Sequence, residues 1–167
     1  MSLNGIKRLL TGVLAVLLLS ACSLAAPAPA REAQVAAVPR TMTVYKSPSC
    51  GCCSLWIDYL EERGYTITIE DYVNMTPIKA DYNVPLPLQS CHTAIIEGYV
   101  IEGHVPLQDI ERLLTERPAV LGLAVPGMPV GAPGMEVAGT PPDAFDVIAF
   151  DAAGNMQVYA SHPNFLR

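Results

Sequence analysis

Residues 41–53 have the sequence TMTVYKSPSCGCC, which joins a β-prone segment to three closely spaced cysteines. The first six residues predict a strand, and the Ser-Pro-Ser that follows ends it. From Ser54 to Arg63 the apolar side chains recur on one helical face, and Gly64 stands where a helix commonly ends. A strand, a Cys-x-x-Cys pair and a helix in this order are typical of thioredoxin-like folds.

The rest of the chain continues this α/β pattern. Thr76 and Pro77 predict the start of a short helix, as N-cap and first helical residue. A glycine at position 98 separates two short apolar segments, which predicts a hairpin. We therefore expect a thioredoxin-like mixed sheet flanked by helices and closed by a C-terminal β-hairpin. The other expected elements are strands at residues 65–70, 92–97, 99–102, 145–150 and 156–159 and a helix at 106–116.

One segment does not fit either helix or strand. Residues 125–135 have the sequence VPGMPVGAPGM, in which proline and glycine exclude regular structure. The segment is too apolar for a solvated linker. We expect a long ordered loop that lies against the domain.

The first residues predict export. Lys7 and Arg8 precede the apolar segment 9–19, which is too short to span a bilayer comfortably. The next residues, through Cys22, resemble the lipobox of bacterial lipoproteins, in which the cysteine receives the lipid. Residues 1–21 are thus expected to be a signal peptide, with an ordinary secretory signal as the alternative.

The predicted organisation places the protein in the periplasm. Residues 22–40 are rich in alanine and proline and predict a tether from the lipid on Cys22 to a domain at 41–160, followed by a tail at 161–167. Ser23, in place of an aspartate, favours anchoring to the outer rather than the inner membrane. The formal net charge of −6 and the lack of basic runs argue against a nucleic-acid partner and suit cations.

Four cysteines remain when Cys22 is assigned to the lipid. An exported chain with four thiols ordinarily suggests two disulfides. Cys50, Cys52 and Cys53 are so close in sequence, however, that disulfides among them would close tiny loops and would restrict the unfolded chain little. The clustering indicates chemistry rather than a structural staple.

Two kinds of chemistry compete for this cluster. As a thiol-disulfide oxidoreductase, Cys50 would attack a substrate disulfide and Cys53 would resolve the product, because a helix N-terminus favours thiolate. This leaves Cys52 without a task. It also gives no task to Cys91 and His92, which a thioredoxin-like fold would bring opposite the cysteine loop. His92 stands where such folds carry a cis-proline.

A metal centre would use all five of these side chains. Soft thiolates select Cu(I), and neutral imidazole suits copper or zinc. Because Cys52 and Cys53 are adjacent, they cannot easily point at one ion together with Cys50, which suggests bridging thiolates and more than one copper. A structural zinc site in a partner-binding module is the third alternative, since three cysteines and one histidine are an ordinary zinc set.

A few other side chains have weaker claims. His104, Met128 and Met135 are further candidate metal ligands, although an exposed histidine and methionines that fill the core are commoner. His162 is expected to be solvated, and Met156 is expected to contribute to packing.

The chain also resembles the CopG-like family of periplasmic copper-resistance proteins, long catalogued only as a domain of unknown function. The resemblance lies in residues 43–53, in Ser90-Cys91-His92-Thr93-Ala94, in residues 99–106 and in the Gly/Pro/Met loop. It implies a thioredoxin-like fold with a cysteine-bridged copper cluster and a role in copper tolerance, including conversion between Cu(I) and Cu(II) by a copper oxidoreductase. By this resemblance the cluster residues are Cys50, Cys52, Cys53, Cys91 and His92. Copper ions and other periplasmic copper-handling proteins are the partners that these features suggest.

Overall fold

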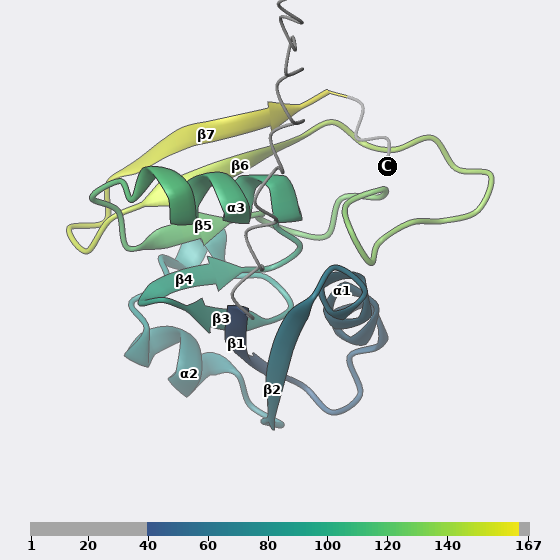
Figure 1. The fold of residues 1–167 in the computed structure, drawn as a ribbon, viewed down its shortest axis with the longest axis horizontal. Helices are drawn as coiled ribbons and strands as arrows, with labels where there is room; N and C mark the ends of the chain where they lie inside the picture. Colours follow the sequence, from purple (N-terminus) through teal and green to yellow (C-terminus); the bar gives the residue numbers. More distant parts are fainter. Residues whose placement is uncertain (1–39, 164–167) are drawn as a thin grey trace, which may run out of the picture. The chain divides into compact units, whose positions relative to one another are not determined.

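The computed structural model describes residues 40–163, and the predicted signal peptide, Cys22 and most of the tether lie outside that range. The elements follow the order β1 (Arg40–Lys46), α1 (Gly51–Glu61), β2 (Tyr65–Asp71), α2 (Thr76–Asp81), the 3₁₀ turn η1 (Leu86–Leu88), β3 (Thr93–Ile96), β4 (Tyr99–Glu102), α3 (Leu107–Glu116), β5 (Gly122–Ala124), β6 (Phe145–Phe150) and β7 (Met156–His162). Figure 1 shows these elements.

All seven strands form one mixed sheet in the order β2-β1-β3-β4-β5-β6-β7. Strand β1 pairs parallel with β2 and antiparallel with β3. The β3–β4 and β6–β7 hairpins are antiparallel, and β5 joins β4 in parallel and β6 antiparallel. The predicted mixed α/β architecture is confirmed, and the arrangement is consistent with a thioredoxin-like one. Residues 40–163 contain no cis peptide bond.

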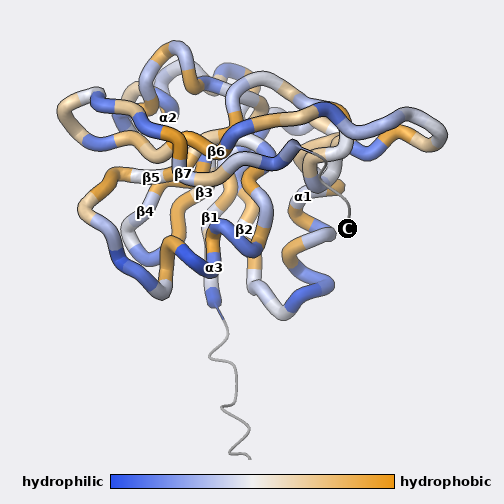
Figure 2. The backbone as a smooth tube through the Cα atoms, turned by 90° about the horizontal axis from the view of Figure 1, so that it is seen from above, coloured by the Kyte–Doolittle hydropathy of each residue, from blue (hydrophilic) through white to orange (hydrophobic). Residues whose placement is uncertain are grey.

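Strand alternation divides the core into two clusters, one on each face of the sheet. On β4, Ile101 belongs to the larger cluster and Val100 to the smaller one. The larger cluster is covered by α1 and α3, whereas the smaller one includes Val84, which precedes η1, and Leu88, the last residue of η1. Figure 2 shows hydrophobic residues gathered along the strands of the sheet. The helices α1 and α3 are thus held against a rigid surface, which fixes the N-terminus of α1.

Several local expectations need correction. Helix α1 begins at Gly51 rather than near Ser54. Its buried face carries the expected Trp56 and Leu60 together with Ile57, whereas Leu55, also expected on that face, is 56% exposed. Helix α2 is capped by Met75 and not by Thr76. Strand β5 was not expected at all. Met156 is exposed rather than packed, because β7 lies at the edge of the sheet.

The Pro/Gly-rich segment after β5 is ordered and contacts the domain, as expected. It approaches α1 so closely at Gly134 that a β-carbon there would lie 2.7 Å from the backbone nitrogen of Trp56. It is also tied to Asp143, whose N–H donates to the carbonyl oxygen of Val130 at 2.8 Å and whose carboxylate accepts from Val130 N–H at 2.9 Å. Within residues 40–163 no helix has the length and apolar character needed to cross a membrane.

Candidate metal centre

The first half of the site lies at the N-terminus of α1. Cys50 is the N-cap residue, with φ −80° and ψ 95°, and Cys52 and Cys53 are in the first turn. The first N–H groups of a helix have no partner within it, and the helix dipole places partial positive charge there. The three sulfur atoms therefore lie beside free backbone N–H groups and the positive end of the helix dipole.

The second half comes from the segment that leads into β3. Cys91 and His92 immediately precede this strand, and β3 lies beside β1, which leads into the cysteine loop. Strand pairing therefore brings Cys91 to the α1 N-terminus, as the sequence predicted. His92 is fixed by its carbonyl oxygen, which accepts a hydrogen bond from Gly103 N–H at 2.9 Å.

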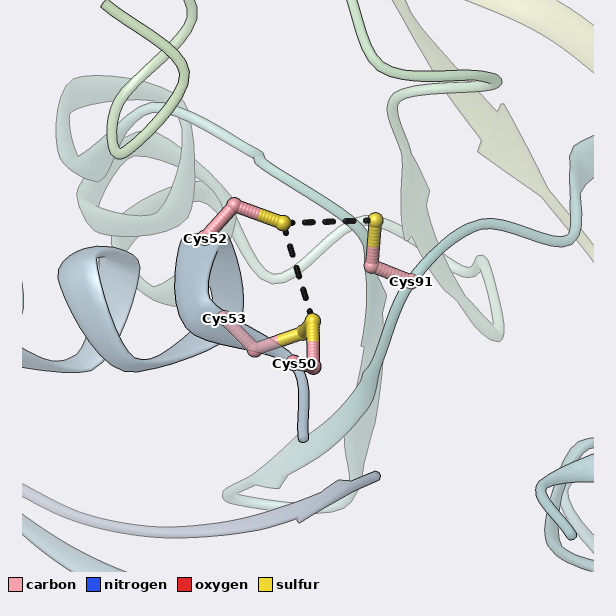
Figure 3. Close-up of side chains that lie close together, drawn as sticks. All are labelled: Cys50, Cys52, Cys53 and Cys91. Carbon is pink, nitrogen blue, oxygen red and sulfur yellow. Dashed lines mark hydrogen bonds between the residues drawn. A yellow bond between two sulfur atoms is a disulfide. The ribbon is translucent and has the colours of Figure 1, made fainter. Parts of the chain in front are cut away.

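The four sulfur atoms form one compact group (Figure 3). All lie within 4.8 Å of one another, and Cys52 stands between the others, with its Sγ 3.6 Å from that of Cys50 and 3.9 Å from that of Cys91. Cys53 is fully buried, whereas the other three are partly accessible. A soft ion could thus reach the group from solvent and find sulfur from both halves of the site.

Two of the four sulfurs are oxidised in this structure. Cys50 and Cys53 form a disulfide, and Cys52 and Cys91 are free thiols. A disulfide sulfur is not a thiolate ligand, so all four can bind metal only after Cys50 and Cys53 gain two electrons and two protons. The arrangement therefore holds both a redox pair and a second pair of thiols that remains available.

The free thiol of Cys91 lies in a less polar environment than a surface cysteine. Burial, together with the nearby Cys52, raises the pKa of Cys91 to about 11. At neutral pH this group is a thiol, and a metal ion must displace its proton on binding. Metal affinity at this site should therefore increase with pH.

Two buried imidazoles lie behind the sulfur group. His92 and His104 are fully buried, and their rings are in edge contact with centroids 5.1 Å apart. His92 also packs on Trp56, at 4.4 Å between ring centroids. Burial lowers the pKa of both histidines, so both are held in the neutral form that can bind a metal. The expectation that His104 is exposed was wrong.

Three nitrogen atoms of this histidine pair have no hydrogen-bond partner among residues 40–163. They are both ring nitrogens of His92 and Nε2 of His104, whereas Nδ1 of His104 lies 2.8 Å from the carbonyl oxygen of Pro133. Buried polar atoms are rarely left in this state. His92 is not part of the compact sulfur group, however, because its ring is turned toward Trp56 and His104.

The loop after β5 contacts both halves of the site. Its Gly134 lies against the first turns of α1, and its Gly127 carbonyl accepts a hydrogen bond from Ser90 Oγ at 2.6 Å, next to Cys91. The Met128 side chain is 59% exposed, and Met135 is half-buried.

Sequence reasoning missed a buried ion pair beside Cys91. Lys79 Nζ lies 2.5 Å from Glu102 Oε1, and both residues are almost completely buried. The available signal was a glutamate at the end of the apolar segment Tyr99–Glu102, where a charge is out of place unless it has a partner. It was also wrong to expect His162 to be solvated, since its Nε2 lies 2.7 Å from Asp109 Oδ2.

Known proteins resemble this chain in both sequence and structure. A family model described as "Protein of unknown function, DUF411" matches residues 88–135, the stretch that contains Cys91, His92 and His104. Two solved structures, Form 1 and Form 2 of a copper resistance protein CopG, have 41% sequence identity and a TM-score of 0.71. The alignments cover 76% and 75% of this chain, respectively, and 100% of each solved chain. No curated protein sequence matches the chain.

Proposed function

This chain belongs to the family of the copper resistance protein CopG, and from that premise we propose that it binds Cu(I) through Cys50, Cys52, Cys53 and Cys91. A copper-related function follows from the relatives and from a cysteine group able to hold metal. The main support for Cu(I) binding by these cysteines is that their four sulfur atoms lie within 4.8 Å of one another. Thiolate ligands suit both Cu(I) and zinc, and the copper resistance relatives favour Cu(I).

Several copper ions bridged by these thiolates suit the geometry better than one ion. Cys52 and Cys53 are neighbours in a helical turn, and Cys52 has a sulfur atom on each side of it. A thiolate in such a central position can bridge two ions. His92 would add an imidazole ligand if its ring turned toward the sulfurs, and its unpartnered nitrogens favour that role.

The redox state of Cys50 and Cys53 provides a chemical link to copper valence. In the reduced protein, these two thiolates can give one electron each to two Cu(II) ions, which yields two Cu(I) ions and the Cys50–Cys53 disulfide. An external dithiol must then return two electrons and two protons to the disulfide. Copper conversion by this protein would thus consume a thiol reductant.

Metal analysis of anaerobically purified protein tests the proposal. We expect reduced protein from copper-fed cells to hold several Cu(I) ions per chain, and Cys52→Ser to lose most of them. Ser54→Ala, which changes the same turn without removing a thiol, should bind copper as the original chain does. Zinc retained under a copper challenge, or reduced wild-type protein that binds no copper, would refute the proposal.

A second candidate function is thiol-disulfide exchange, and the Cys50–Cys53 disulfide at a helix N-terminus favours it. An oxidoreductase that uses this pair should keep its activity in Cys52→Ser, whereas a copper protein should lose its metal. Reduction of a model disulfide peptide, measured beside copper binding on the same variant, separates the two functions.

We also propose that the protein is a lipoprotein held in the periplasm through Cys22, with the outer membrane as its site. The support is the apolar segment that ends in Leu19-Ser20-Ala21-Cys22. Labelling cells with a radioactive fatty acid should mark the original protein and leave Cys22→Ser unlabelled. Recovery of both proteins in the soluble periplasmic fraction would contradict the anchor.

A further inference from the structure

The ion pair between Lys79 and Glu102 belongs to a buried hydrogen-bond network that includes Ser90 and Thr93, on either side of Cys91 in the sequence. Glu102 Oε1 accepts hydrogen bonds from Lys79 Nζ at 2.5 Å and from Ser90 N–H at 2.6 Å. Glu102 Oε2 accepts from Thr93 Oγ1 at 2.7 Å, and Lys79 Nζ lies 3.2 Å from the same hydroxyl. Each carboxylate oxygen thus has a donor, and the network leaves neither charge unpaired.

Stability alone does not explain such a network. Removing two charges from water costs several kcal/mol, and apolar residues of similar volume often replace a buried ion pair with no loss of stability. Glu102 is fully buried and Lys79 is 5% exposed, so the cost of removing water applies to both. A buried pair of this kind is better explained by the geometry that it imposes on its neighbours.

The neighbours in question are the residues on either side of Cys91. Ser90 precedes Cys91 and donates its backbone N–H to Glu102, while Thr93 follows two residues later and donates its hydroxyl to the same carboxylate. Thr93 and Glu102 are also register partners in the β3–β4 hairpin. The Glu102 side chain therefore holds the backbone just before Cys91 and the Thr93 side chain just after it.

The surrounding packing leaves little room for this segment to shift. A β-carbon on Gly103, the residue that follows β4, would lie 2.6 Å from Ser90 Oγ, so the chain there approaches Ser90 as closely as glycine allows. Gly103 N–H also donates to the carbonyl oxygen of His92. Cys91 is held by backbone contacts at both neighbours, and its sulfur projects to within 3.9 Å of Cys52.

We propose that Glu102, balanced by Lys79, is a positioning residue that holds Cys91 against Cys52 and so joins the two halves of the sulfur group. This inference rests on the proposed copper function only for its biological meaning. The geometric claim concerns the metal-free protein and can be measured without copper.

Two double variants that differ in one acceptor test the claim. Lys79→Met/Glu102→Leu removes both charges and the acceptor for Ser90 N–H, whereas Lys79→Met/Glu102→Gln removes both charges and keeps an amide oxygen in that place. Both should fold, because neither leaves a buried charge unpaired. Any difference in behaviour between the two variants is therefore due to the lost acceptor for Ser90 N–H and not to the lost ion pair.

The readout is the rate at which diamide joins Cys52 to Cys91 in a chain whose other cysteines, Cys22, Cys50 and Cys53, are serine. In this reaction the two thiols lose two electrons and two protons to diamide. Because a misplacement of about 1 Å can cost on the order of 100-fold in rate, we expect the Leu variant to react at least about tenfold more slowly. The Gln variant should stay close to the parent chain. Equal rates in all three chains would overturn the proposal.

Hydrogen exchange at Ser90 in the unsubstituted chain gives a test that no misfolded variant can obscure. We expect its amide to be protected, since its acceptor is a buried carboxylate. Exchange as fast as that of a solvated loop amide would overturn the proposal. A slowed diamide reaction in a protein that binds no copper would instead support the positioning role and refute the copper function.

Discussion

Replacement of Gly134 by alanine should push the loop away from α1 and lower the free energy of unfolding by an amount that the structure allows us to work out. Gly134 has φ +82°, and a β-carbon there would meet the backbone nitrogen of Trp56 at 2.7 Å and the carbonyl oxygen of Cys52 at 2.9 Å. Both atoms belong to the helix backbone, which cannot yield as a flexible side chain can. The loop itself must therefore move away from the turn that carries the cysteines.

Two terms make up the cost of Gly134→Ala. The left-handed backbone costs an L-residue roughly 1–2 kcal/mol, and forcing an extra carbon into a packed site costs about 1–3 kcal/mol. Gly139→Ala is the matched control, because its φ is +77° and no atom lies within 4 Å of the added carbon. Gly139→Ala therefore has only the cost of the left-handed backbone. Gly134→Ala should thus lower the free energy of unfolding by about 1–3 kcal/mol more than Gly139→Ala.

Urea unfolding at equilibrium, with the same slope for both variants, measures this difference. Copper binding provides a second readout, because the displaced loop would loosen Cys52 in Gly134→Ala but not in Gly139→Ala. Equal losses of stability in the two variants would show that the loop does not press on α1, and the argument from Gly134 would fail.

Three further outcomes are expected. A hydrogen bond with Tyr82, together with burial, raises the pKa of Tyr45 from 10.0 to about 12. The unfolded chain therefore loses this proton first, stability declines between pH 10 and 12, and Tyr45→Phe should flatten the decline. Trp56, the only tryptophan, packs against His92 with ring centroids 4.4 Å apart, so copper bound at the site should quench its fluorescence. His162→Ala should cost about 1–3 kcal/mol in urea unfolding by leaving Asp109 without its 2.7 Å partner.

The sequence was sufficient for the elements with strong local patterns. The strand before the cysteines, the helix after them and the two hairpins each have a periodic apolar pattern and a clear turn residue. Strand β5 has only three residues and gains its structure from β4 and β6, which are distant in sequence. Gly122 in β5 shows this dependence, because a β-carbon there would lie 2.0 Å from the carbonyl oxygen of Val100.

Among the site residues, too, those with a local sequence signal could be predicted and those placed by distant contacts could not. Three cysteines in four residues are visible as a cluster in any reading of the sequence, and the fold class placed Cys91 opposite them. The burial of His104 was not predictable locally, since a histidine between glycine and valine resembles an exposed turn. Its Nδ1 lies 2.8 Å from the carbonyl oxygen of Pro133, a partner that only the folded loop brings to it.

The oxidation state of the site should set how much copper the protein holds, rather than whether it holds any. When Cys50 and Cys53 are joined, Cys52 and Cys91 remain as thiols 3.9 Å apart, one from each half of the site. Two thiolates are enough for one Cu(I), whereas a bridged cluster needs the other two as well. Under the proposed function, reduction of one disulfide would convert a small copper site into a large one without any change of fold. The Cys52–Cys91 pair is thus the part of the site that stays available in both oxidation states, and it is the pair that we propose Glu102 to position.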